Sequence, residues 1–442
     1  MPIGIKTFAR KVFSQFEKPS LLYKGISKHI FPGIPTAPFR VKARLYGLES
    51  ELKQRNVTYN LGSLYTLPHF EAASVYKQFI KYNPGNLGDW SDNVSQTYAT
   101  TELEYEVIHS MIDLYRGSHV GLRGYITSGA TEGNIFSVWL GKQYLEQHFG
   151  KKMICLLKSS LTHYSVRKAG QLCSVPQFVV PLNTKWGMDG DGFKNLVQTL
   201  FRKGYRGFII PLTLGYTSTG TSDDIESIVR EADKLKKKLK NTEFFFWIDA
   251  AMSGLVSPFI RKDFRPFQSS YIKTFVVDFH KFGQVPYPAG TIIYRRELKR
   301  IIERKIDYLR ETDATLLGSR SGIPAISIWT MIHTLGKTGY TDIVNEQKRN
   351  KKFFIEKIQA MLPETEVITH ADSLSCGLVF KGLTHFRLPK NIEEKYNFFP
   401  GKTNVLFYPN TAKKIVLYKC YFLPHLKRRV LNEFFADLED IV

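Results

Sequence analysis

The chain has 442 residues, of which 43% are hydrophobic, and a formal net charge of +22. This length exceeds what one hydrophobic core usually supports, and the apolar content excludes disorder over most of the chain. No apolar run reaches the about 18 residues of a membrane-spanning helix. The four cysteines are far apart and form no CxxC pair, which argues against zinc clusters and a disulfide framework; they are Cys155, Cys173, Cys376 and Cys420. We therefore expect a cytoplasmic protein without a metal site.

The basic excess indicates attraction to anionic surfaces or acidic ligands. The lysines and arginines are scattered, with short runs at 235–240 and 425–429, and most are expected on solvated helix faces. We expect no specific nucleic-acid partner, and peripheral contact with a membrane surface stays open.

Residues 1–58 are predicted to form a basic N-terminal arm. Short basic pieces are interrupted by Pro19, Pro32, Pro35 and Pro38. The first residues lack the apolar core and cleavage site of a secretory signal. A transit peptide or a membrane-surface helix is the alternative to a simple arm.

Strands and helices alternate between residues 59 and 325, which we expect to form a large domain. Two helices come first, from Pro68 to about Asn83 and within 100–117. Apolar patterning then predicts strands at 123–129, 153–160, 177–183, 207–215, 244–251, 273–280 and 291–296. Helices are predicted at 131–149, 163–173, 191–204 and 222–240. This order predicts an α/β fold with a mostly parallel central sheet and helices on both faces.

After about residue 325 the pattern changes to that of a smaller C-terminal α+β domain, residues 326–442. It contains a long amphipathic helix, three short strands and a terminal helix, at 339–363, 377–383, 404–409, 414–422 and 425–442.

Four strand ends carry residues that suggest chemistry. Lys281 follows a core strand, where water is scarce. The ammonium is destabilised there, so the amine becomes a usable nucleophile for a Schiff base. Without the other three features, Lys281 would also fit an ordinary surface lysine. The small residues of 127–134 leave backbone N–H groups for a phosphate at a helix N-terminus. Asp249 ends an apolar strand, where a carboxylate is costly to bury without a cation. His163 follows another strand. Ligands of such sheets bind beyond the carboxyl ends of the strands.

One cofactor requires all four features. Pyridoxal phosphate has a phosphate, a flat ring, a pyridine nitrogen and an aldehyde. The phosphate would be held by residues 127–134, and the ring would stack on His163. Asp249 would pair with the pyridine nitrogen, and Lys281 would react with the aldehyde.

The chain resembles the group II pyridoxal-phosphate-dependent amino-acid decarboxylases, which have the type I, aspartate-aminotransferase-like fold. It looks most similar to the archaeal-type tyrosine/aspartate decarboxylase branch. The resemblance covers residues 61 to 342 through the stretches GSLYTLPH, NLGD, TSGATEGN, HYSVRKAG, TSTGTSDDI, WIDAAMSGLVSPF, VDFHKFGQVPYPAG, GSRSG and LGKTGY.

The resemblance implies decarboxylation of an L-amino acid to its amine and CO2, in a homodimer with shared active sites. It implies that Lys281 forms the Schiff base, Asp249 pairs with the pyridine nitrogen and His163 stacks on the ring and takes part in catalysis. The remaining cofactor-binding positions that it implies are Gly129, Ala130, Thr131, Ala251 and His280. Tyr308 is the proton donor by position, or else an exposed loop tyrosine without a role. Arg320 is expected to reach a carboxylate or a neighbouring subunit.

Three positions depart from the family pattern. Asp278 stands where many members have Ser, and a carboxylate aimed at a phosphate would repel it. Either Asp278 points elsewhere, or the phosphate uses other donors. Tyr216 stands where Thr is usual, and Ala130 replaces a common Gly.

Three alternatives to the decarboxylase remain. A sphingosine-phosphate lyase-like enzyme would cleave a carbon–carbon bond with the same cofactor. A cysteine desulfurase-like enzyme would need a mobile catalytic cysteine, and Cys376 lies in an apolar, strand-like context. The third alternative is a non-catalytic basic scaffold. The sequence does not identify the substrate.

Overall fold

The computed structural model describes residues 37–54, 57–88, 99–307, 311–401, 406–407, 409, 411 and 414–440. The chain separates into two compact units, Met1–Val57 and Thr58–Val442. The first unit includes helix α2 (Pro38–Gln54). Most of the predicted arm, residues 1–36 and 55–56, lies outside the described residues.

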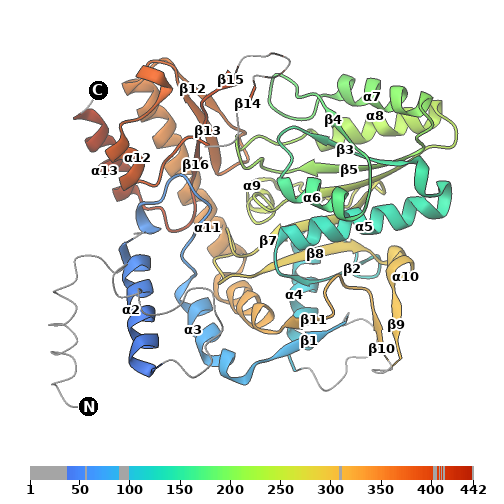
Figure 1. Cartoon of the computed structure of the whole chain (residues 1–442), viewed down its shortest axis with the longest axis horizontal. Coiled ribbons are helices and arrows are strands. Elements are labelled where there is room, and N and C mark those ends of the chain that lie inside the picture. Colours follow the sequence, from blue (N-terminus) through green and yellow to red (C-terminus); the bar gives the residue numbers. More distant parts are fainter. Residues whose placement is uncertain are drawn as a thin grey trace. The chain divides into compact units, whose positions relative to one another are not determined.

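A seven-stranded sheet forms the centre of the second unit (Figure 1). Its strand order is β2 (Leu122–Thr127), β8 (Gly290–Arg295), β7 (Ile272–Asp278), β6 (Glu243–Asp249), β5 (Gly207–Thr213), β3 (Ile154–Ser159) and β4 (Gln177–Val180). Strand β8 runs antiparallel to both neighbours, and the other pairs are parallel. The predicted, mostly parallel sheet is confirmed. The reversed direction of β8 was not foreseen, because an apolar run does not reveal the direction of its strand.

Helices cover both faces of this sheet, as predicted. Along β6, Phe244 and Phe246 pack in one core cluster and Phe245 and Trp247 in the other, because successive side chains point to opposite faces. The first cluster includes residues of α4 (Thr101–Leu114), α7 (Gly190–Arg202) and α8 (Ile225–Lys238). The second includes residues of α5 (Ala130–Phe149) and α6 (Tyr164–Leu172).

The C-terminal part is built on the long helical segment α11 (Ile323–Met361), which is broken at Gly336 (φ 56°). It begins well before the predicted residue 339. A three-stranded antiparallel sheet follows, in the order β12 (Thr365–Ile368), β13 (Ser375–Phe380) and β16 (Tyr418–Tyr421). Two helices complete it, α12 (Lys390–Lys395) and α13 (Arg428–Glu439). Because α11 runs across residue 325, the boundary between large and small domains stays a prediction.

Helix α3 (Phe70–Phe79) lies within the helix predicted from Pro68 to about Asn83. The antiparallel pair β14 (Leu406–Phe407) with β15 (Lys414–Ile415) lies within the strands predicted at 404–409 and 414–422. Other short elements were not predicted, since three- to four-residue elements carry no periodicity. They are the antiparallel pairs β1 (Gly85–Leu87) with β11 (Ser319–Ser321) and β9 (Arg304–Ile306) with β10 (Glu311–Asp313), and the helices α9 (Ser257–Ile260) and α10 (Lys299–Ile302). Short 3-10 turns lie at Val57–Tyr59, Ile80–Tyr82, Lys151–Met153, Arg296–Leu298 and Thr384–Phe386.

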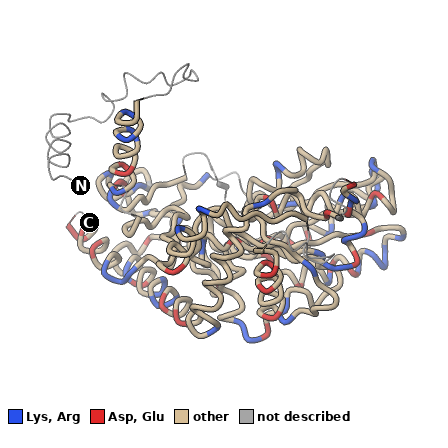
Figure 2. The backbone as a smooth tube through the Cα atoms, turned by 90° about the horizontal axis from the view of Figure 1, so that it is seen from below, with Lys and Arg blue, Asp and Glu red and all other residues tan. Residues whose placement is uncertain are grey.

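Basic and acidic residues are interspersed along the described chain (Figure 2), as expected for solvated helix faces. Within the described ranges, no helix combines the length and apolar character needed to cross a membrane.

Candidate active site

The predicted residues converge at the carboxyl edge of the central sheet. The alternation that turns Trp247 toward α5 turns Asp249, two residues later, to the same face. At the other side of the edge, Gly290 of β8 pairs with both Thr127 and Asp278. A Cβ on Gly290 would lie 2.7 Å from the Cα of Gly129, so only glycine allows this approach. The end of β2 is thereby brought beside the end of β7.

Asp249 is a buried carboxylate held in a fixed position. Its Oδ2 accepts a 2.8 Å hydrogen bond from Asn134 Nδ2, and its Oδ1 accepts one of 3.2 Å from the Ala251 N–H. Asn134 is oriented in turn by Trp247, whose Nε1 donates to Asn134 Oδ1 at 2.9 Å. Burying a charge is costly unless it is hydrogen-bonded. This network therefore keeps a carboxylate ready for a cationic partner.

His163 is linked to Asp249 through two intervening side chains. It caps the N-terminus of α6, and its Nδ1 lies 2.8 Å from Ser165 Oγ. Ser165 Oγ also accepts a 3.0 Å bond from Asn134 Nδ2. Burial lowers the pKa of His163; Asp249 opposes this effect, and Lys281 adds to it. The imidazole is therefore neutral at neutral pH, as a flat ring for stacking should be.

Lys281 forms an ion pair with Asp278. The distance from Lys281 Nζ to Asp278 Oδ2 is 2.8 Å, and both side chains are largely shielded from water. The other carboxylate oxygen, Asp278 Oδ1, accepts a 2.6 Å bond from the Ala130 N–H. Burial raises the pKa of Asp278, but Lys281, His280 and the Ala130 N–H outweigh burial and lower it. Asp278 is thus a carboxylate that points at the turn before α5, not away from it.

The turn that precedes α5 packs against His280. Gly129 has a φ of 138°, which favours glycine. A Cβ there would lie 2.9 Å from His280 Cε1 and 3.1 Å from Asp278 Oδ1. The Ser128 N–H is donated to Glu132 Oε2 at 2.7 Å. Two backbone N–H groups of the turn, those of Ser128 and Ala130, thus already donate to carboxylates, Glu132 and Asp278.

An aromatic pair lies on the outer side of His280. The Tyr287 ring stacks on His280 with centroids 4.0 Å apart, and the Tyr65 ring is 6.3 Å from that of Tyr287. Burial lowers the pKa of His280, and the Asp278 carboxylate opposes this effect. Tyr287 and Tyr65 are 48% and 64% exposed, so an aromatic surface adjoins the site.

Other residues singled out from the sequence lie elsewhere. Tyr308 falls outside the described residues. Arg320 reaches a carboxylate, as expected, and it is that of Glu104 in the same chain. Tyr216 is buried and bonds Asp223 and Ser159. Cys376 is buried in β13, where it faces Cys420 of β16, so it is not on a mobile loop.

Sequence reasoning missed three residues that shape the site, Asn134, Ser165 and Glu104. Asn134 closes the TSGATEGN stretch one turn after Ala130, and that spacing places it on the same helix face as Ala130. Ser165 follows His163 by two residues, a spacing typical of local hydrogen bonds at helix starts. Glu104 gives no such signal, because its partners lie far away in the sequence.

The donor set fits pyridoxal phosphate. A buried carboxylate for the pyridine nitrogen, a neutral imidazole for the ring and a shielded amine for the aldehyde come from Asp249, His163 and Lys281. The space beside Gly129, which a Cβ would fill, lies against His280. These are the groups that this cofactor requires of a protein.

Comparisons with known proteins bear on the family and the fold. Residues 93–381 match the family model described as the pyridoxal-dependent decarboxylase conserved domain. Among curated relatives, the tryptophan decarboxylase of Clostridium sporogenes is 26% identical over 377 residues, which cover 84% of this chain and 86% of the relative. The probable L-tyrosine/L-aspartate decarboxylase of Methanosphaera stadtmanae is 27% identical over 404 residues, with coverages of 86% and 91%.

A solved structure, the L-methionine decarboxylase of Streptomyces sp. 590, superposes with a TM-score of 0.79 at 17% identity. The match covers 93% of this chain and 96% of the other. At this identity the likeness bears on the fold, and the predicted type I fold is confirmed.

Proposed function

Because the chain belongs to the pyridoxal-dependent decarboxylase family, we propose that it releases the carboxylate of an L-amino acid as CO2 with Lys281 as the cofactor-binding lysine. The family match makes pyridoxal phosphate its cofactor and carboxy-lyase its enzyme class. The observation that carries the assignment of residues is the convergence of Lys281, Asp249 and His163 at one sheet edge.

Each of these residues has a distinct role. When bound, pyridoxal phosphate supplies a ring that accepts the electrons of a bond breaking at the substrate Cα. Asp249, fixed by Asn134 and the Ala251 N–H, keeps a proton on the ring nitrogen. His163 offers a neutral ring to stack on. Lys281 supplies the amine that holds the cofactor.

The phosphate is assigned to the turn before α5. Gly129, Ala130 and Thr131 hold it there, with His280 beside them, and Asp278 shares the Ala130 N–H. Tyr308 remains our choice for the proton donor, on the family resemblance alone.

The rival reactions have less support. The matching family and the relatives named above are decarboxylases, which disfavours a carbon–carbon lyase of sphingosine phosphate type. A desulfurase would need a mobile cysteine, and Cys376 is buried in a strand. A scaffold protein would not need the Asp249–Asn134 network.

We further propose a cytoplasmic homodimer. Reducing conditions suit the free cysteines. The exposed aromatic surface at Tyr65 and Tyr287 adjoins His280, so a second subunit bound there would border the active site.

The first prediction tests the cofactor lysine. Purified protein should carry a visible absorbance band that borohydride abolishes, and peptide mass spectrometry should place the reduced pyridoxyl group on Lys281. Lys281→Ala should lack the band. Lys273→Ala is the matched control, because Lys273 lies near the opposite end of the same strand, β7. A wild-type protein that takes up no pyridoxal phosphate would sink the proposal.

The substrate is found by measuring CO2 release from a panel of L-amino acids that spans aromatic, imidazole, acidic, thioether and hydroxyl side chains. Aldehyde release from a sphingoid phosphate is measured beside it. Aldehyde without CO2 would favour the lyase.

A further inference from the structure

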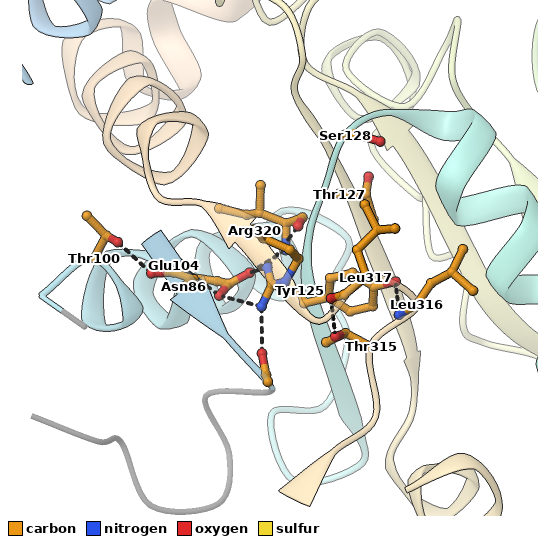
Figure 3. Close-up of polar contacts among 12 residues, drawn as sticks. Asn86, Thr100, Glu104, Tyr125, Thr127, Ser128, Thr315, Leu316, Leu317 and Arg320 are labelled. Atoms are coloured by element: carbon orange, nitrogen blue, oxygen red, sulfur yellow. Dashed lines mark hydrogen bonds and ion pairs between the residues drawn. The ribbon is translucent and has the colours of Figure 1, made fainter. Parts of the chain in front are cut away.

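The outer edge of the central sheet is closed by two side chains instead of a strand. Among the described strands, β2 pairs only with β8. On the open side of β2, the Ile126 N–H donates to Glu104 Oε1 at 2.6 Å, and the Ile126 carbonyl accepts from Arg320 Nη1 at 3.0 Å. Figure 3 shows both side chains meeting beside Tyr125. Glu104 and Arg320 therefore make the contacts that a neighbouring strand would otherwise make.

These two side chains form a buried, two-pronged ion pair. Arg320 Nη1 lies 2.5 Å from Glu104 Oε1, and Nη2 lies 3.2 Å from Oε2. Asn86 Nδ2 donates to the same Oε2 at 3.0 Å, and the guanidinium lies 5.0 Å from the centroid of the Tyr125 ring. Burial lowers the pKa of Arg320, but Glu104 outweighs it and raises the pKa. Such geometry fixes both partners in orientation as well as in charge.

Arg320 also binds the backbone that follows β1. Arg320 Nη2 donates to the Gly88 carbonyl at 2.6 Å, and in the β1–β11 ladder Arg320 stands opposite Asn86. Asn86 Oδ1 in turn accepts from Thr100 Oγ1 (Figure 3). One guanidinium thus joins β1, α4, β2 and β11, although they lie far apart in the sequence.

Ile126, the residue held by Glu104 and Arg320, lies directly before the proposed phosphate turn, Thr127 to Thr131. Thr127 and Ser128 follow it, and α5 begins at Ala130. We propose that Arg320 and Glu104 are positioning residues that hold the phosphate turn in register with Lys281. This inference rests on the proposed function, because it takes the turn as the phosphate site. A displacement of about 1 Å at a binding group can cost roughly 100-fold in rate.

A half-buried arginine on β8, Arg295, provides the control. Arg295 Nε donates to the Ile272 carbonyl, and its Nη2 donates to the carbonyls of Phe267 and Ser269, at 2.7 to 3.0 Å. It ends β8, at the edge of the sheet opposite the cofactor turn. Lysine at either position loses bonds to backbone carbonyls, and Arg320→Lys also weakens the ion pair with Glu104. Only Arg320 lies next to the turn.

The second prediction compares Arg320→Lys with Arg295→Lys. Both should lower the midpoint of thermal unfolding. At a temperature where both are folded, Arg320→Lys should raise the dissociation constant of pyridoxal phosphate at least about tenfold and shift the absorbance band of the bound cofactor. Arg295→Lys should leave that constant within about twofold of the wild type. Titration of the apoprotein with the cofactor measures the constant.

The double variant Glu104→Gln/Arg320→Met removes both charges of the ion pair, so it leaves no unpaired buried charge that would unfold the protein. It should show the same weakened cofactor binding as Arg320→Lys. A folded double variant with the wild-type dissociation constant would overturn the inference alone. A wild type without bound cofactor would overturn the proposed function instead.

Discussion

At the scale of single residues, Asp278 is the most informative position in the site. Sequence analysis left open whether it points away from the phosphate turn, and the structure shows it bound to the Ala130 N–H and to Lys281. A carboxylate there would act on the proposed cofactor in two ways. It would repel the phosphate, and its ion pair with Lys281 would have to open before the amine can react.

The third prediction follows from these effects. Asp278→Asn removes the charge that repels the phosphate, so it should lower the dissociation constant of pyridoxal phosphate. We expect a decrease of about tenfold, which corresponds to about 1.4 kcal/mol. The amide oxygen of Asn can still accept from Ala130. Titration with pyridoxal, which lacks the phosphate, separates repulsion from the effect on the amine. Weaker binding of pyridoxal phosphate by Asp278→Asn would show that the carboxylate supports the site instead.

Asp278 also predicts a pH dependence of stability. Its pKa in the folded chain is lowered, so its contribution is present above the unfolded value of about 3.9 and is lost as the pH falls through the folded value. The difference in urea midpoint between wild type and Asp278→Asn should therefore shrink below about pH 4.

At the scale of elements, the loop after β5 is tied to its strand by a buried network. Tyr216 Oη donates to Asp223 at 2.8 and 2.9 Å and lies 2.8 Å from Ser159 Oγ. Asp223 also accepts the N–H groups of Thr213 and Met188. Burial raises the pKa of Asp223 to about 6, and these hydrogen bonds oppose the rise. Tyr216, which departs from the family pattern, is thus part of the packing of the loop.

The fourth prediction concerns this network. Tyr216→Phe should lower the free energy of unfolding by about 1–2 kcal/mol, because a buried carboxylate loses a donor. The loss raises the pKa of Asp223 further, and ionised Asp223 is the costly form. The destabilisation should therefore be larger at pH 8 than at pH 5, as measured by urea unfolding.

Tyr340→Phe is the matched control for Tyr216→Phe. Tyr340 is buried, and its hydroxyl has no hydrogen-bond partner among the described residues. Its removal should change the free energy of unfolding little at either pH. Equal losses in the two variants would contradict a specific role for Tyr216.

At the scale of the whole molecule, the Thr58–Val442 unit exposes large aromatic side chains that suit the proposed dimer. Large aromatic side chains are exposed at Tyr65, Phe70, Tyr82 and Tyr287. Aromatic residues are enriched in the centres of protein interfaces. The full chain has a net charge of +22, and an excess of this kind opposes association at low salt.

The fifth prediction tests the proposed dimer. Phe70, which is 77% exposed, begins α3. Phe70→Glu should raise the dimer dissociation constant at least about tenfold, because one lost aromatic anchor costs more than 1 kcal/mol. Analytical ultracentrifugation measures the constant. Leu172→Glu, on the similarly exposed end of α6, should leave it unchanged. A wild type that stays monomeric at all concentrations would contradict the dimer.

The sequence by itself determined the large α/β architecture and the candidates for the site. Long apolar strands and amphipathic helices are recognised by their periodicity, which depends only on neighbours in the chain. Lys281, Asp249 and His163 were predicted because each follows or ends a strand, and strand ends of a parallel sheet share one edge.

Only the tertiary structure decided how these residues are held. The Asp249–Asn134–Ser165–His163 chain joins the end of β6 to α5 and to the start of α6, and the ion pair of Arg320 with Glu104 spans 216 residues. The direction of β8 and the orientation of Asp278 also depend on partners far along the chain. Contacts between distant segments leave no periodic trace in a single sequence, because they are fixed by packing.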